Sequence, residues 1–281
     1  MKALDMTVVF ESIHRMPSLP VVVMELLASM DQDEVPVGAL ASKISQDQAL
    51  TAKTLRLANS SFYGRTQRVN SMSEAISILG FRAVRSIVTT AGVIQTVPGN
   101  LVNPHALHPF WCHAIATAVC ARELAPHLQV SADHAYTAGL LHDIGRLILV
   151  SQFPQHYAAV LDYRAAQDCA MLDAEQEVLG LDHTAIGAAL ANYWKFSGAM
   201  QLAIGGHHMV NTAANHPLCA TFHLANVLAH GLDMAADNPT DAVPTIAPAA
   251  WALLPKESDT MLGIFSRIET LYAGAIQILN D

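Results

Sequence analysis

Apolar residues recur at helical spacing along this chain of 281 residues, and no segment shows the alternation of a half-buried strand. Aromatic residues make up only 6 % of the sequence while alanine and leucine abound, which favours helix over strand. Hydrophobic residues account for 52 % and charged residues for 14 %, so a disordered chain is excluded. We therefore expect an all-α fold of one large domain or two small ones.

The helical pattern is interrupted near the middle of the chain. The stretch from Thr96 to His108 contains Pro98-Gly-Asn100 and Asn103-Pro104, which are strong loop signals. We therefore predict an N-terminal helical subdomain over residues 1–103 and a second helical subdomain over residues 104–281.

Several helix boundaries are marked by local signals. Ser71-Met-Ser-Glu74 fits a capping box, and Gly80 fits the end of the helix that follows it. In the second half we predict a helix from Pro109 to His127 and one continuous helix over Ala132–Gln152. The other expected helices cover residues 21–30, 37–45, 48–59, 81–95, 154–167, 172–179, 183–195, 198–206, 217–232 and 259–279, with loops at 60–64 and 235–249.

The dipeptide His142-Asp143 lies in an apolar, helix-like run from Ala138 to Arg146. An unpaired buried charge is costly, so such a pair usually finds a metal or a hydrogen-bond partner. A lone histidine in such a run is more often a core residue bonded to backbone, so the argument depends on grouping. Four other histidines occupy similar apolar settings: His113, His183, His207 and His208. We expect these five imidazoles and Asp143 to converge in one pocket as a metal-ligand set.

Four runs of the sequence carry a resemblance to a known family. They are Ile44–Ser60, Ala75-Ile-Ser-Ile-Leu-Gly80, Ala138–Leu149 and Leu179-Gly-Leu-Asp-His183-Thr-Ala-Ile-Gly187. Together they resemble the HDOD branch of the HD superfamily of metal-dependent phosphohydrolases. The resemblance covers most of the chain and implies an HD-type helical bundle with an N-terminal helical subdomain. Matching the motifs of the related HD-GYP phosphodiesterases implies metal ligands at His113, His142, Asp143, His183, His207 and His208.

The sequence departs from the catalytic relatives in three places. Ala225-Asn226 stands where the superfamily has a late Ala-Asp, and Asp233 lies about 10 Å further along a helix, too far to substitute. Arg146 replaces the lysine that follows the His-Asp motif, and the Gly-Tyr-Pro signature is absent. With Asp143 as the only carboxylate, a half-filled, mononuclear or empty site is easier to stabilise than a reactive dinuclear one.

The resemblance implies a regulatory role, because HDOD proteins are modules of bacterial signalling, often linked to cyclic-di-GMP pathways and motility. We favour a non-enzymatic signal-transduction module that binds a protein or nucleotide partner. The alternative is a metal-dependent phosphohydrolase or phosphodiesterase acting on a nucleotide or cyclic nucleotide, with Asp143 and Arg146 as catalytic residues. If a metal is bound, the imidazole-rich set favours iron, zinc, manganese or nickel over calcium or magnesium.

Charge is distributed unevenly along the chain. Residues 43–85 hold seven basic and two acidic residues, a net +5 that leaves −14 for the rest of a chain of net charge −9. This segment fits a surface for an anionic partner, such as a nucleotide or an acidic protein face. The plainer alternative is that its side chains only solvate helices and pair with Asp47 and Glu74. A faint helix-turn-helix pattern lacks a turn glycine, and the chain is acidic, so we do not expect nucleic-acid binding. The basic residues are Lys43, Lys53, Arg56, Arg65, Arg68, Arg82 and Arg85.

Cysteine usage and hydropathy are those expected of a cytoplasmic protein. Cys112 and Cys120 lie about 12 Å apart along one expected helix, too far to form a disulfide. None of the four cysteines is in a C-x-x-C pair, so we expect reduced thiols. Two long stretches without charged residues contain proline, asparagine and histidine, and neither predicts a transmembrane helix.

Overall fold

A computed structural model describes residues 3–31, 37–59, 69–96, 104–208, 217–234 and 243–279. Over these residues the protein is all-helical and contains no β-strand, which confirms the expected fold class. No described helix is both long enough and apolar enough to cross a membrane. All four cysteines are free thiols.

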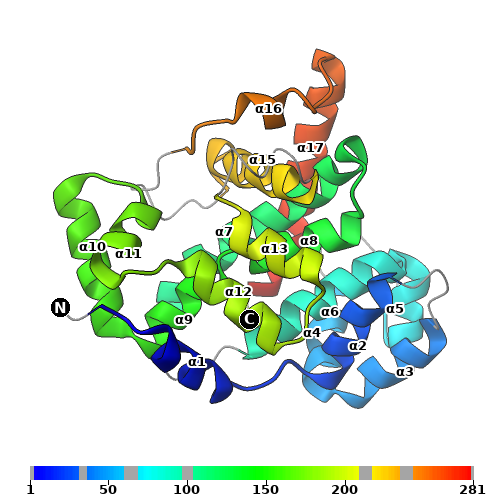
Figure 1. The fold of residues 1–281 in the computed structure, drawn as a ribbon. Coiled ribbons are helices and arrows are strands. Elements are labelled where there is room, and N and C mark those ends of the chain that lie inside the picture. The colour runs from blue at the N-terminus through cyan, green and yellow to red at the C-terminus, as the bar shows by residue number, and fades with distance from the viewer. Residues whose placement is uncertain are drawn as a thin grey trace.

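One group of helices comes from the N-terminal third of the chain and lies together in Figure 1. Its central member is α6, which packs against α2, α4 and α5 and also reaches α8 of the second group. The first helix, α1 (Met6–His14), packs against α12 instead. The group comprises α2 (Val21–Ala28), η1 (Ser29–Asp31), α3 (Val37–Gln46), α4 (Gln48–Ala58), α5 (Met72–Leu79) and α6 (Phe81–Thr96).

The second group is built around α7, which packs against α8, α15 and α17. Residues 111–121 of α7 are all buried, because this helix presents small and apolar side chains on every side. The group comprises α7 (Pro104–Leu124), η3 (Ala125–Leu128), α8 (Ala132–Leu141), α9 (Ile144–Gln152), α10 (Pro154–Gln167), α11 (Met171–Leu179), α12 (His183–Tyr193), α13 (Gly198–Gly206), α15 (Pro217–Gly231), α16 (Pro248–Trp251), α17 (Ser258–Ala275) and η4 (Ile276–Leu279).

The predicted signals around α5 are present. The Ser71 hydroxyl accepts a hydrogen bond from the backbone N–H of Glu74, as a capping box requires. The Glu74 carboxylate reaches back one residue further than expected, to the N–H of Asn70 at 2.8 Å. Gly80 ends the helix at φ +83°, a conformation that favours glycine.

Two predicted helix boundaries in the second half were wrong. The helix expected from Pro109 begins at Pro104, where a proline fits the first helical position, and it ends at Leu124 before the short helix η3. The helix expected over Ala132–Gln152 is two helices, α8 and α9, separated at His142-Asp143. Apolar periodicity continues through this break, so the pattern hides it. The expected loop at 60–64 lies outside the described residues, as does most of the one at 235–249, whose end includes the start of α16 at Pro248.

Candidate metal centre

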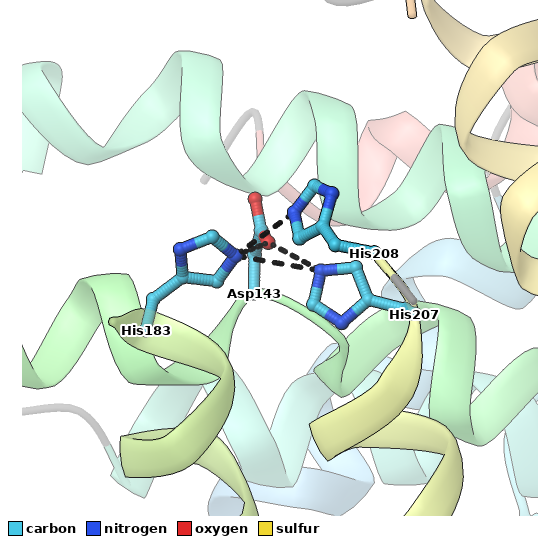
Figure 2. A group of neighbouring side chains, drawn as sticks. All are labelled: Asp143, His183, His207 and His208. Atoms are coloured by element: carbon cyan, nitrogen blue, oxygen red, sulfur yellow. Dashed lines mark hydrogen bonds and ion pairs between the residues drawn. The ribbon is translucent and has the colours of Figure 1, made fainter. Parts of the chain in front are cut away.

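The break between α8 and α9 brings Asp143 into the interior of the second group. Asp143 is the N-cap residue of α9, a position from which aspartate usually accepts hydrogen bonds from the first helix amides. Its side chain makes no such cap bond. The carboxylate instead points toward histidines from other helices, as Figure 2 shows. The site therefore depends on the helix break.

Four side chains form the first half of the cluster. The Oδ1 atom of Asp143 lies 3.3 Å from His183 Nε2 and 3.4 Å from His207 Nε2. His208 Nε2 lies 3.1 Å from His183 Nε2. One donor atom from each of these four residues falls within 4.8 Å of the others. His183 opens α12, and His207 and His208 directly follow α13.

The second half of the cluster shares Asp143 with the first. His142 Nε2 lies 3.5 Å from Asp143 Oδ1 and 3.3 Å from His113 Nε2, which comes from α7. Donor atoms of these three residues also lie within 4.8 Å of one another. The structure thus brings together all six residues that the sequence singled out as metal ligands.

In three of the imidazoles, those of His142, His183 and His207, the Nδ1 atom faces away from the cluster and contacts a hydrogen-bond acceptor. His142 Nδ1 lies 2.8 Å from the carbonyl oxygen of Gly139, and His207 Nδ1 lies 2.7 Å from that of Ile204. Because a carbonyl oxygen only accepts, both rings carry a hydrogen on Nδ1, so Nε2 is the nitrogen that a neutral ring offers to a metal. Metal-ligating histidines typically have this arrangement.

Glu175 is a site residue that the sequence reasoning missed. Its Oε2 atom accepts a hydrogen bond of 2.6 Å from His183 Nδ1, and the Glu175 side chain is fully buried in α11. The available signal was a glutamate on the apolar face of its helix, one turn from Met171 and Leu179. A buried carboxylate on that face requires a partner.

Burial and mutual contacts shift the pKa values of the cluster. Burial lowers the pKa of His142 to about 4 and that of His208 to about 2, and it lowers the pKa of His113 well below its ordinary value. For His183, burial opposes the charged form, but Asp143 and Glu175 raise the pKa to about 9. Burial likewise opposes the Asp143 carboxylate, yet the neighbouring His142 and His183 hold its pKa well below its ordinary value. At neutral pH these values make His113, His142 and His208 neutral imidazoles and leave His183 charged.

This donor set fits a transition-metal ion. The Nε2 atoms of His183, His207 and His208 lie 3.1 to 3.4 Å apart where they are in contact. Ligands about 2.0–2.1 Å from a tetrahedral ion are separated by about 3.3 Å. Converging lone pairs repel one another unless a cation or proton lies between them. Imidazole-rich sites suit zinc, iron, copper or nickel better than calcium or magnesium.

Arg146 contacts the cluster through the carboxylate. Its Nη1 atom donates to Asp143 Oδ2 at 3.0 Å, and Nη2 donates to the Tyr157 hydroxyl at 3.5 Å. These contacts orient Asp143 and leave Oδ1 for the imidazoles. The catalytic role expected of Arg146 in a phosphohydrolase remains a prediction.

One basic residue of the 43–85 segment, Arg85, lies in the interior and not on a surface. Arg85 is 5 % exposed and pairs with Asp133 of α8, and burial lowers its pKa. It is therefore an interior contact between the two helix groups, and its expected place in a docking surface was wrong. Lys43 pairs with Glu25 rather than with the two acids of the segment, while the Arg82 side chain is 81 % exposed. Arg65 and Arg68 lie outside the described residues.

Comparison with known proteins identifies the family. A sequence profile of the HDOD domain matches residues 16–210, a span that contains all six residues of the cluster. The chain belongs to the HDOD family. An HDOD domain protein of unknown function from Geobacter sulfurreducens has the same fold, with a TM-score of 0.77 and 20 % identity over 99 % of each chain.

Two further relatives extend the comparison of this HDOD protein. A presumed phosphohydrolase from Shewanella amazonensis is 26 % identical, with a TM-score of 0.71 over 96 % of this chain and 97 % of the other. An uncharacterized protein of Treponema pallidum is 26 % identical over 238 residues, which is 83 % of this chain and 45 % of that protein. The HDOD chain thus spans less than half the length of that curated relative.

Proposed function

We propose that this HDOD protein is a regulatory signal-transduction module with a buried transition-metal centre, and that it binds a protein or nucleotide partner. The observation that carries the proposal is the convergence of imidazole Nε2 atoms on Asp143, with the outer nitrogens of the rings held by fixed acceptors. Such outer contacts set ring orientation before a metal arrives. An ion here would tie together helices that are distant in sequence.

The cluster lies on a path between the two helix groups. Asp143 and His142 follow α8, and α8 contacts α6 of the N-terminal group. That contact includes a hydrogen bond of 3.0 Å between Thr90 and Tyr136 and the ion pair of Arg85 with Asp133. A ligand that binds one conformation of α8 more tightly than another shifts the conformational equilibrium of both helix groups. In this proposal metal loading is the input signal, and the surface of the N-terminal group is the output.

Limited access to the cluster favours regulation over turnover. His113, His142, Asp143, His183 and His207 are each between 1 % and 7 % exposed, and only His208 of the six residues is more accessible. Asn226 adds no negative charge, and Arg146 is engaged with Asp143. A reactive dinuclear centre usually has more carboxylate than this.

Metal-dependent phosphohydrolysis is the second candidate. It is favoured by the 26 % identity to the presumed phosphohydrolase of Shewanella amazonensis over nearly the whole chain. The position of Arg146, beside the shared carboxylate, also suits a group that binds phosphate. A metal would supply Lewis-acid chemistry at such a site.

The rate of phosphodiester hydrolysis distinguishes the regulatory module from the phosphohydrolase. Protein loaded with iron, zinc, manganese or nickel is assayed against cyclic dinucleotides, cyclic mononucleotides and a generic phosphodiester. The regulatory proposal predicts absent or very slow hydrolysis. A rate of about one per second or faster, the low end of ordinary enzymes, contradicts it and supports the phosphohydrolase.

For the partner, we propose an anionic ligand or protein face at the exposed basic residues of the N-terminal group. Arg82 is the test position, because its side chain is 81 % exposed. Binding of cyclic dinucleotides and nucleoside triphosphates is measured at low and high salt for the wild type and for Arg82→Glu. Salt-sensitive binding that the variant loses supports the proposal, since exposed charges are screened over about 8 Å at physiological ionic strength. Equal binding by both proteins contradicts it.

A further inference from the structure

Two arginines of α6 share a single carboxylate of α8. Arg85 Nη2 donates to Asp133 Oδ2, and Arg82 Nε lies 3.8 Å from the same oxygen. Hydrogen bonds from nitrogen to oxygen are about 2.7–3.2 Å long, so Arg82 is attracted to this carboxylate without being bonded to it. Among the described residues, neither arginine forms an ion pair with a second acid. The three side chains together therefore carry one positive charge in excess.

The two arginines differ in their exposure to water. The Arg82 side chain is 81 % exposed, whereas that of Arg85 is 6 % exposed. Of the atoms that the structure describes, Arg85 Nε is buried without a hydrogen-bond partner, and the guanidinium lies 5.3 Å from the centre of the Phe81 ring. A buried donor without an acceptor is uncommon and unfavourable. Asp133 thus satisfies the hydrogen-bonding groups of the two arginines only in part.

A phosphoryl group has the acceptor capacity that Asp133 lacks. It offers three strong acceptor oxygens, and guanidinium groups bind such oxygens in pairs. Arg82 and Arg85 are three residues apart on α6, so their side chains are neighbours on that helix and one phosphoryl group can accept from both. Asp133 stands in the first turn of α8, where the helix N-terminus stabilises a carboxylate that faces water. The exchange therefore leaves neither Arg85 nor Asp133 without a favourable partner.

We propose that Asp133 is an internal competitor for the anionic ligand: the phosphoryl groups of a nucleotide bind Arg82 and Arg85 by displacing Asp133, which releases the first turn of α8 from α6. This inference rests on the anionic ligand of the proposed function and names how its binding is regulated. Arg85 is interior in this structure, so a ligand reaches it only once Asp133 has moved. The far end of α8 leads directly to His142 and Asp143, so the displaced helix is the one that carries part of the histidine cluster.

Isothermal calorimetry of pyrophosphate binding to chelator-stripped protein tests the proposal, because the histidine cluster then holds no ion that could bind phosphate. The substitution Asp133→Asn removes the competing charge and should tighten binding at least about fivefold, at the lower end of ordinary coupling between sites. Loss of a charge-assisted contact in Arg82→Gln should weaken binding about tenfold or more. The control is Asp162→Asn, an exposed position on α10 with the same change in net charge, and it should alter the affinity less than about twofold.

Hydrogen–deuterium exchange of the wild type provides a second test that needs no variant. Saturating pyrophosphate should increase amide exchange in the first turn of α8, because the contact with α6 is released. Unchanged or slower exchange there overturns the proposal, and it decides the matter if Asp133→Asn does not fold, as checked by circular dichroism. Hexaglutamate is the comparison ligand, and tighter binding of this acidic peptide than of pyrophosphate overturns the assignment to a nucleotide.

The remaining outcomes distinguish the competition from the anionic site itself. If neither the wild type nor Asp133→Asn binds pyrophosphate, the anionic site of the proposed function is wrong. If both bind it equally and Arg82→Gln does not, the site stands and only the competition by Asp133 is overturned. An equal gain in Asp133→Asn and Asp162→Asn also overturns the competition, because net charge alone then explains the effect.

Discussion

The carboxylate of Glu175 holds His183 by two contacts, accepting from Nδ1 at 2.6 Å and from the backbone N–H at 2.8 Å. The two residues come from adjacent helices, α11 and α12. The ring therefore faces Asp143 with its Nε2 atom, and rotation of the ring would break a charge-assisted bond. Glu175 is in this way a positioning residue for the cluster rather than a ligand.

Replacing Glu175 with glutamine should lower metal affinity by about 10–100-fold, the usual effect of removing such an outer partner. Glutamine can still accept from the backbone, but it removes the negative charge that supports His183. Competition with a chromophoric zinc chelator measures the change. Glu177→Gln, an exposed neighbour on the same helix, should have no effect. Unchanged affinity in a folded Glu175→Gln protein would show that the carboxylate does not support the metal site.

The substitution Asn226→Asp should strengthen metal binding in the half of the cluster nearest α15. The substitution adds a negative charge on α15, at a position whose oxygen is already buried and unpaired. We expect zinc to bind at least about tenfold more tightly, equivalent to about 1.4 kcal/mol. Isothermal calorimetry of zinc binding to chelator-stripped protein measures the change, with the exposed Asn192→Asp as control. An equal gain in both variants would mean that net charge alone is responsible.

The stability of the metal-free protein should pass through a maximum near pH 6.5. The pKa values of His142 and His208, about 4 and about 2, lie below the ordinary 6.5, so the unfolded chain takes up protons first as the pH falls below 6.5. The free energy of unfolding therefore decreases as the pH falls below 6.5. His183, with a pKa of about 9, contributes stability that is complete below pH 6.5 and is lost as the pH rises through 9. Thermal melts from pH 4 to pH 10 measure this, and a melting temperature that is constant from pH 5 to pH 9 would contradict it.

Gly145→Ala should destabilise the protein by about 1–3 kcal/mol or more, because overpacking against backbone cannot be relieved by a side-chain rotation. A Cβ atom at this position would lie 2.0 Å from the carbonyl oxygen of His183 and 2.8 Å from the backbone nitrogen of Gly187. Urea unfolding measures the effect. Gly38→Ala, where no atom lies within 4 Å of the added Cβ, should be neutral or stabilising by about 0.4–1 kcal/mol. Similar stabilities of the two variants would contradict the close approach of α9 and α12.

The sequence allowed prediction of the features that depend on local pattern. Helical periodicity gave the fold class, and the signals at Ser71 and Gly80 gave the limits of α5. Five histidines and Asp143 lie in similar apolar segments of the sequence, and this shared placement predicted the six residues that the structure brings into one cluster. Their role as metal ligands remains a prediction.

The remaining features depend on contacts between distant segments. The pairing of Arg85 with Asp133 spans 48 residues, and nothing in the charge count of its segment distinguishes a buried arginine from an exposed one. The helix break at Asp143 is hidden by continuous apolar periodicity. The contact between the rings of His230 and His113 likewise exists only because α15 packs against α7.

Elemental analysis of the purified wild type and of Asp143→Asn tests the central claim most directly. Asp143 is shared by both halves of the cluster, and asparagine preserves its shape while removing the charge. We expect iron, zinc, manganese or nickel in the wild type, in a whole-number ratio to protein, and loss of most of that metal in the variant. A folded wild type without any of these metals, even after incubation with each, would contradict the claim, as would a variant that retains the full metal content.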